Sequence, residues 1–125
     1  MRVREVVVLA SLALAGPALA RDTIGLSLST LNNPFFVTLR DGAEAAASKA
    51  GLEVVVLDAQ DKADKQVSDI EDLVQRKVKV VLVNPTDAAA VVPAIRRANA
   101  AKVPVITVDR AASGGEVAYH IASAM

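Results

Sequence analysis

Short apolar runs alternate with longer amphipathic stretches along most of this chain. The runs contain mainly Val, Ile and Leu with little alternation of polar residues, which is typical of parallel strands covered on both faces. They lie at 23–29, 53–58, 78–84 and 103–109, and a weaker candidate lies at 117–121. The pattern therefore predicts four parallel strands and a weaker fifth.

Three helices are expected between these strands. The first begins at Pro34 and is ended by Gly51, because glycine readily takes the positive φ that ends helices. The second covers 64–76, with acidic residues early and a basic residue late, as the helix dipole favours. The third runs from about 87 to 101 and contains Pro93, which fits only in a first turn, where the backbone N–H has no partner.

The alternation of strands and helices with short links predicts an α/β fold. We expect a parallel sheet with right-handed crossovers and helices on both faces, in a three-layer sandwich. Pro104 stands at the beginning of a predicted strand, where the missing N–H donor does little harm. No internal repeat or linker interrupts residues 21–125. This part of the chain is therefore expected to form one lobe.

The amino-terminal segment has the pattern of a secretory signal peptide. An uncharged apolar run at 6–15 follows a basic start, and 18–20 has the small-x-small form of a cleavage site. The run is well short of the roughly 20 residues that span a bilayer, which argues against a retained anchor. We expect residues 1–20 to be removed by cleavage between Ala20 and Arg21.

The overall charge excludes two classes of partner. Lys and Arg total 14, and Asp and Glu total 14. This balance gives no electrostatic footprint for a nucleic acid or an anionic membrane. Cysteine is absent, so the exported protein has neither a disulfide nor a thiol for a lipid. We expect no direct membrane insertion after cleavage.

The sequence shows no motif for catalysis, for a metal or for a cofactor. His120 is the one histidine, and the carboxylates show no metal-ligand spacing. No G-x-S-x-G nucleophile elbow occurs. The Gly-rich segment 113–115 follows a strand without a succeeding helix pattern, which indicates a turn and not a phosphate-binding loop. We therefore expect neither an enzyme nor a bound metal or cofactor.

Polar residues follow the predicted strands at their carboxyl ends, where open α/β sheets bind ligands. A sugar hydroxyl both donates and accepts hydrogen bonds, and Asp109 only accepts, Arg110 only donates and Asn33 does either. Charged partners strengthen such bonds. The sequence therefore predicts a site for a polyol at this edge. Its candidate residues are Ser29, Asn32 and Asn33; Asp58, Gln60 and Asp61; Asn84, Thr86 and Asp87; and Asp109 and Arg110.

Phe35 and Phe36 are the two phenylalanines of the chain, and they stand where the first strand passes into the first helix. An aromatic face suits the apolar C–H side of a sugar ring. Successive helical residues differ by about 100°, so the two rings cannot share one environment. Phe36 lies on the inward stripe, where a core role and a ligand contact both remain open, whereas Phe35 is expected to face the ligand.

Several polar residues of this edge also have structural interpretations. Asp87 precedes an Ala-rich stretch and is expected to cap the third helix rather than to bind a ligand. Asp58 and Asp61 are expected to be solvated or capping groups. Asp109 and Arg110 are adjacent, which leaves open a surface ion pair of little energetic value.

Six segments together carry a family resemblance. They are Asp22-Thr23-Ile24, Ser29-Thr30-Leu31-Asn32-Asn33-Pro34-Phe35-Phe36, Val56-Leu57-Asp58, Asn84-Pro85-Thr86-Asp87, Val103-Pro104-Val105-Ile106-Thr107-Val108-Asp109-Arg110, and Gly115-Glu116-Val117 with His120-Ile121-Ala122-Ser123. They resemble the type I periplasmic sugar-binding proteins of ABC importers, and within that family the binders of D-ribose. The Asn-Asn-Pro-Phe-Phe segment with the Asp-Arg pair is fairly specific to binders of pentoses and related sugars.

The resemblance implies a clamshell of two α/β lobes that closes over one monosaccharide, with D-ribose expected first. In the first lobe the two rings edge the pyranose while the Asp-Arg pair holds hydroxyls. The resemblance further implies a periplasmic location, with a membrane ABC permease and a chemotaxis receptor as partners. The ligand contacts that it implies are Ser29, Asn33, Phe35, Phe36, Asp109 and Arg110.

The resemblance covers one lobe, because the family builds a second lobe after a hinge that follows the His-Ile-Ala-Ser segment. Residues 21–125 are therefore expected to be an N-terminal lobe, truncated near the first hinge crossing. Half a site leaves a sugar partly solvated, so poor or no ribose binding is expected of this chain alone. The alternatives are a sugar-sensing core of the lactose-repressor type, which would carry a helix-turn-helix in place of the leader, a small α/β enzyme, and a non-functional fragment.

Overall fold

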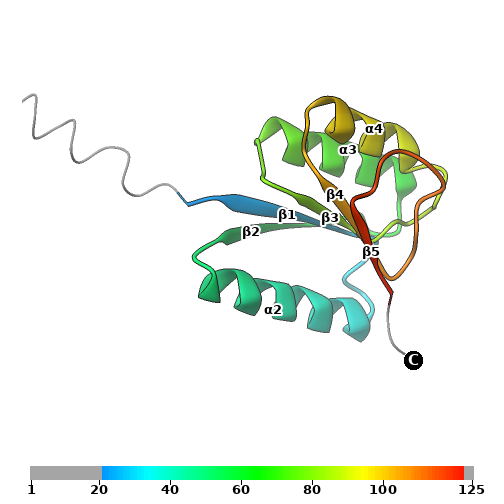
Figure 1. Cartoon of the computed structure of the whole chain (residues 1–125). Helices are drawn as coiled ribbons and strands as arrows, with labels where there is room; N and C mark the ends of the chain where they lie inside the picture. Colours follow the sequence, from blue (N-terminus) through cyan, green and yellow to red (C-terminus); the bar gives the residue numbers. More distant parts are fainter. Residues whose placement is uncertain (1–20, 123–125) are drawn as a thin grey trace, which may run out of the picture.

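The computed structural model describes residues 21–122 and shows a parallel five-stranded sheet between two layers of helix (Figure 1). The strands lie in the order β2-β1-β3-β4-β5. The predicted α/β three-layer fold, including the fifth strand, is confirmed. The predicted signal peptide, residues 1–20, lies outside the described residues. The elements are β1 (Thr23–Leu28), α2 (Pro34–Lys49), β2 (Glu53–Asp58), α3 (Ala63–Gln75), β3 (Val81–Val83), α4 (Val92–Ala100), β4 (Val105–Val108) and β5 (Tyr119–Ile121).

The helices cover the two faces of the sheet unequally. Helices α3 and α4 pack together on one face, and α2 lies on the other beside β2 (Figure 1). Gly25 of β1 faces α3, because a Cβ added there would lie 2.8 Å from Leu73 Cδ1. The residues on either side of Gly25 therefore point toward α2, since side chains alternate along a strand.

The hydrophobic core lies mainly between the sheet and the pair α3–α4. Its buried members are apolar side chains of these two helices, of β3 and β4, and of the links between them. This packing holds α3 against the sheet, so that side chains of α3 lie close to the carboxyl ends of the strands. The buried residues are Ile70, Leu73, Val78, Val81, Val83, Val91, Ala94, Ile95, Ala98, Val103 and Val105.

Every helix passes into its following strand through the same turn. A residue with φ of 60–74° ends the helix, namely Gly51, Lys77 or Lys102. The next N–H then bonds back to a carbonyl five residues earlier, as in Leu52 N to Ala47 O at 2.8 Å and its counterparts Val78 N to Leu73 O and Val103 N to Ala98 O. This is the Schellman pattern of helix ends. The predicted role of Gly51 is confirmed.

This turn explains why two strands are shorter than predicted. Strands were expected at 78–84 and 103–109, but β3 is Val81–Val83 and β4 is Val105–Val108. Val78 and Val103 are buried, yet their N–H groups close helices and are not part of a strand ladder. Apolar character alone does not separate a strand residue from the apolar residue of a Schellman turn.

Helix α4 begins later than predicted. The sequence places its start near Asp87, whereas the structure has a separate turn at 87–91 and begins the helix at Val92. Pro93 then falls in the first two helical positions, where its missing N–H costs nothing. Pro93 thus lies in the first turn of the helix, as predicted, but the predicted start of the helix near Asp87 was wrong.

The link between β4 and β5 packs against α4. Its predicted turn at 113–115 is confirmed, and Gly115 takes φ 80°. A Cβ at Gly115 would lie 2.6 Å from Ile95 Cγ2, so only glycine fits there. Asn99 also holds the link, since its Nδ2 donates to Glu116 O at 2.9 Å and its Oδ1 accepts from Glu116 N at 2.8 Å.

Candidate functional site

The candidate site lies at the carboxyl ends of β1, β3 and β4. The chain passes from β1 outward to β2 and then returns to the other side of β1 for β3, so the strand order reverses between β1 and β3. Such a reversal leaves the crevice in which open α/β sheets bind ligands. The six ligand contacts that the resemblance implies all follow β1 or β4, and these strands flank β3.

Ser29 anchors the end of β1 beneath this edge. It is only 6% exposed, and its Oγ donates to Asn84 Oδ1 at 2.5 Å. Its carbonyl accepts from Asp61 N at 2.7 Å. Because its hydroxyl proton is used by Asn84, Ser29 can offer a ligand only the remaining lone pairs of Oγ.

Asn33 begins α2 and orients the phenylalanines. It is the N-cap residue, and its Oδ1 accepts from Phe35 N at 2.9 Å. Pro34 then occupies the first helical turn, where proline is favoured. The cap uses the side-chain oxygen of Asn33, so its Nδ2 amide is the group that remains to meet a ligand.

The two rings have different environments, as the helical stripe predicts. Phe35 is 45% exposed, whereas Phe36 is half-buried. Their centroids are 5.1 Å apart and their planes are inclined at 79°, an edge-to-face pair. Phe36 therefore supports the ring of Phe35 from the side, and Phe35 presents an exposed apolar surface at the rim.

Asp109 and Arg110 leave β4 in a tight turn. Asp109 has φ 67°, its N–H donates to Ile121 O at 2.8 Å, and Arg110 N donates to Val108 O at 2.7 Å. The Arg110 side chain turns toward the end of β3, where its Nη1 donates to Pro85 O at 2.9 Å and to Thr86 O at 2.7 Å. The guanidinium is thus held at the rim by backbone carbonyls.

Two other carboxylates of this edge, those of Asp58 and Asp87, cap turns. Asp58 Oδ1 accepts from Gln60 N at 2.8 Å. Asp87 Oδ1 accepts from Ala90 N at 2.8 Å and Ala89 N at 2.9 Å, and these backbone donors lower the pKa of Asp87. Asp87 therefore caps the turn at 87–91, whereas the sequence predicted that it would cap the helix that follows.

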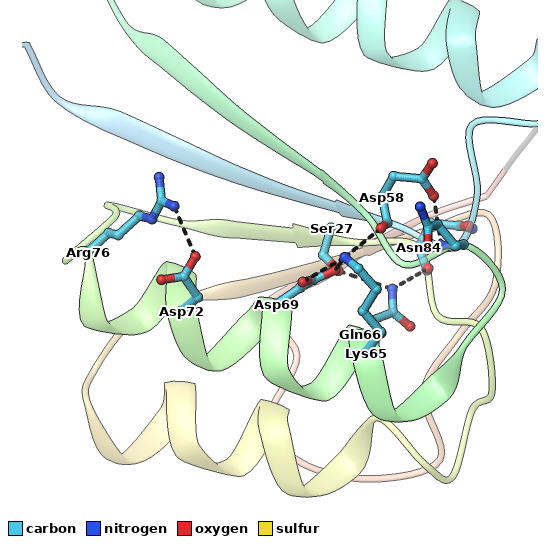
Figure 2. Close-up of polar contacts among 9 residues, drawn as sticks. Ser27, Asp58, Lys65, Gln66, Asp69, Asp72, Arg76 and Asn84 are labelled. Atoms are coloured by element: carbon cyan, nitrogen blue, oxygen red, sulfur yellow. Dashed lines mark hydrogen bonds and ion pairs between the residues drawn. The ribbon is translucent and has the colours of Figure 1, made fainter.

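Two buried polar residues lie at the centre of this edge: Asn84, which the sequence named as a candidate, and Gln66, which it did not. Asn84 is 2% exposed and joins the ends of three strands, since it follows β3, bonds Ser29 after β1, and donates from Nδ2 to Val108 O of β4 at 3.0 Å. Gln66 of α3 is fully buried beside it (Figure 2). The sequence signal that could have identified Gln66 is its position one turn before Ile70, which places a polar side chain on the inward face of an amphipathic helix.

The site is an open edge and not an enclosed cavity. One hollow of about 430 Å³ is lined by residues from Asn99 to Ala118 and lies away from the predicted residues. A second, of about 240 Å³, lies between α2 and the sheet and is lined by apolar side chains such as Ile24 and Leu82. Within residues 21–122, no group of three or more His, Cys, Asp or Glu side chains could hold a metal ion. Nor does this part of the chain contain a helix long and apolar enough to cross a membrane.

Comparison with protein families matches residues 24–124 to the family described as periplasmic binding protein domain. The ribose import binding protein of Salmonella typhimurium is 51% identical over 113 residues, which make up 90% of this chain and 38% of that protein. The ribose import binding protein of Bacillus subtilis is 54% identical over 101 residues, or 81% of this chain and 33% of that one. The chain thus spans 33–38% of the length of these relatives.

Solved structures of sugar and polyol binders share the fold. The myo-inositol binding protein of Caulobacter, bound to myo-inositol, aligns with a TM-score of 0.77 at 37% identity, over 87% of this chain and 37% of that one. A solute binding protein of Actinobacillus succinogenes with bound D-allose gives a TM-score of 0.74 at 28% identity, over 79% and 38% of the two chains. In both cases this chain corresponds to a little over a third of the other protein.

Proposed function

Because this chain belongs to the periplasmic binding protein family, as its sequence segments predicted, we propose that it is one lobe of the substrate-binding component of an ABC sugar importer. Its proposed ligand is D-ribose or a similar monosaccharide. The observation that carries this proposal is the exposed ring of Phe35 on the same sheet edge as Asp109 and Arg110. That combination offers an apolar face together with a carboxylate acceptor and a guanidinium donor, which suits a sugar ring.

Each residue of the proposed site has a distinct role. Phe35 contacts the C–H face of the sugar, and Phe36 holds that ring in place and reaches the sugar with its edge. The carboxylate of Asp109 accepts from sugar hydroxyls, and the guanidinium of Arg110 donates to them with its nitrogens other than Nη1. Asn33 donates from Nδ2. Ser29 contributes an acceptor from beneath.

One lobe is expected to supply only half of the contacts. The matched segment makes up only 38% of the ribose import binding protein of Salmonella typhimurium, and a sugar on an open edge keeps much of its surface in water. We therefore propose that closure of a second lobe buries the ligand and presents a closed face to the permease. A chemotaxis receptor is the further proposed partner of that closed form.

Ribose titration of two proteins tests this proposal. The first is residues 21–125 alone, for which calorimetry is expected to detect poor binding or none. The second is a two-lobed chimera, in which residues 21–122 replace the matching segment of the ribose import binding protein of Salmonella typhimurium. The chimera is expected to bind ribose, because it restores the second half of the site.

The outcomes separate the two parts of the proposal. Tight binding by residues 21–125 alone would show that the second lobe is not required. A folded chimera that does not bind ribose, while the intact relative does, would remove ribose as the ligand of this lobe. Titration with myo-inositol and D-allose in parallel then reports whether another polyol takes its place.

We further propose that the protein is periplasmic and that residues 1–20 are its signal peptide. The small-x-small sequence before Arg21 supports this proposal. Expression of the whole chain in a Gram-negative host, followed by intact-mass measurement of the periplasmic fraction, is expected to give a product that begins at Arg21. A product that retains Met1 in the cytoplasmic fraction would contradict both cleavage and export.

A further inference from the structure

Gln66 is a buried amide near the beginning of α3, one turn before the core residue Ile70. The buried residues of α3 are Gln66, Asp69, Ile70 and Leu73, and Gln66 has no exposed surface. A buried amide destabilises a protein unless it is hydrogen-bonded. Its partners therefore indicate what the residue does.

Gln66 holds the segment that leaves β3 from both sides. Its Nε2 donates to Asn84 O at 2.8 Å and to Ser27 Oγ at 3.1 Å (Figure 2). Its Oε1 accepts from Thr86 N at 2.8 Å. The two backbone groups flank Pro85, so one side chain fixes both ends of the segment 84–86.

The segment fixed by Gln66 is the one that holds Arg110. The carbonyls of Pro85 and Thr86 accept from Arg110 Nη1 at 2.9 and 2.7 Å. Arg110 itself is exposed and has a long flexible side chain, so water would leave its guanidinium in many orientations. The direction of the guanidinium therefore depends on where these two carbonyls point.

We propose that Gln66 is a positioning residue, which aims the Arg110 guanidinium at the ligand by clamping the carbonyls of the segment 84–86. Gln66 lies beneath the rim and does not itself touch the ligand. Its effect on affinity arises because a guanidinium ordered before binding loses less freedom when the ligand arrives. The effect on a sugar rests on the proposed function, whereas the ordering of Arg110 does not.

Nitrogen-15 spectra of arginine side chains test the ordering in residues 21–125 without any ligand. The expected spectrum has Nη proton signals of Arg110 in slow exchange, identified by their loss in Arg110→Lys. In Gln66→Met, which keeps the length of the side chain but removes its hydrogen bonds, these signals are expected to average and broaden. Gln75→Met is the matched control, because Gln75 is an exposed residue at the end of the same helix.

A backbone amide spectrum of each variant shows whether that variant is folded. If Gln66→Met does not fold, Gln66→Glu is measured, because it keeps an acceptor for Thr86 N while losing the amide donors, and partial averaging of the Arg110 signals is expected. Arg110 signals that stay in slow exchange in a folded Gln66 variant would overturn the proposal. So would equal loss of these signals in Gln75→Met.

A double-mutant cycle in the two-lobed chimera tests the consequence for binding. Gln66→Met is expected to weaken ribose binding severalfold, but by no more than Arg110→Ala does, because the effect is carried by Arg110. The same change made in an Arg110→Ala background is expected to have little further effect, because it acts through Arg110. Losses that simply add would mean that Gln66 acts elsewhere and would overturn the proposal. If the unaltered chimera does not bind ribose, ribose is removed as the ligand of this lobe, and the spectra alone decide on the clamp.

Discussion

Replacement of Leu73 by alanine is expected to lower the free energy of unfolding by about 2–5 kcal/mol. Leu73 has no exposed surface and lies in α3 between the helix pair and the sheet. Three of its atoms lie within 3.1 Å of the position that a Cβ would take at Gly25, so the side chain packs directly on the backbone of β1. Urea unfolding of residues 21–125, followed by far-ultraviolet circular dichroism, measures the loss.

The contact between Gly25 and Leu73 can be tested by combining substitutions at the two positions. In the unaltered protein, Gly25→Ala is expected to destabilise by about 1–3 kcal/mol, because the new Cβ would lie 2.8 Å from Leu73 Cδ1. In the Leu73→Ala background the obstructing atoms are absent, and the same change is expected to be neutral or stabilising. The predicted coupling between the two positions is about 1–3 kcal/mol.

Leu39→Ala is the control for this pair, since Leu39 is a half-buried leucine of α2, on the opposite face of the sheet. It is expected to lose less stability than Leu73→Ala and to show no coupling with Gly25→Ala. A Leu73→Ala loss below 1 kcal/mol, or a Gly25→Ala effect that is the same in both backgrounds, would contradict the packing of β1 on α3.

Arg110→Ala in the two-lobed chimera is expected to weaken ribose binding by 1 kcal/mol or more, which is about fivefold or greater. The change removes the charge-assisted donors of the rim and leaves the carbonyls of Pro85 and Thr86 exposed to water. Fold stability is expected to change little, because Arg110 is an exposed residue after β4. Calorimetry of the chimera and its variant gives the difference in affinity.

Two further variants identify the source of that loss. Arg110→Lys retains the charge but not the planar fork, so it is expected to recover only part of the affinity. Arg96→Ala removes an exposed arginine from α4 and serves as the control, with no expected change. An Arg110→Ala affinity equal to that of the unaltered chimera would remove Arg110 from the site.

Local patterns predicted the elements well where a residue has one dominant role. Gly51 has no side chain and takes the positive φ that ends α2, and Pro93 can stand only at the beginning of a helix. Val78 and Val103 were assigned to strands, because a buried valine in a Schellman turn has the same character as a buried strand valine. The two kinds of valine differ in the hydrogen-bond partner of the backbone N–H, and the identity of the residue does not determine that partner.

Some features of the candidate site follow from local sequence, and others depend on contacts between distant residues. The exposure of Phe35 and the lesser exposure of Phe36 follow from helical spacing alone. The functional roles of the six proposed residues remain predictions for the titrations above. Gln66 and Asn84 could not be predicted as the centre of the edge, because their partners lie 18–55 residues away in the sequence.

By itself, the sequence determined the class of fold, the positions of the polar strand ends and the family to which the chain belongs. These depend on periodicity, on turn residues and on contiguous motifs, all of which are local. Only the tertiary structure decided that β3 lies between β1 and β4, that Asn84 links all three strand ends, and that Arg110 turns toward the end of β3. The physical reason is that a hydrogen bond depends on two groups meeting in space, and strand order is what brings these groups together.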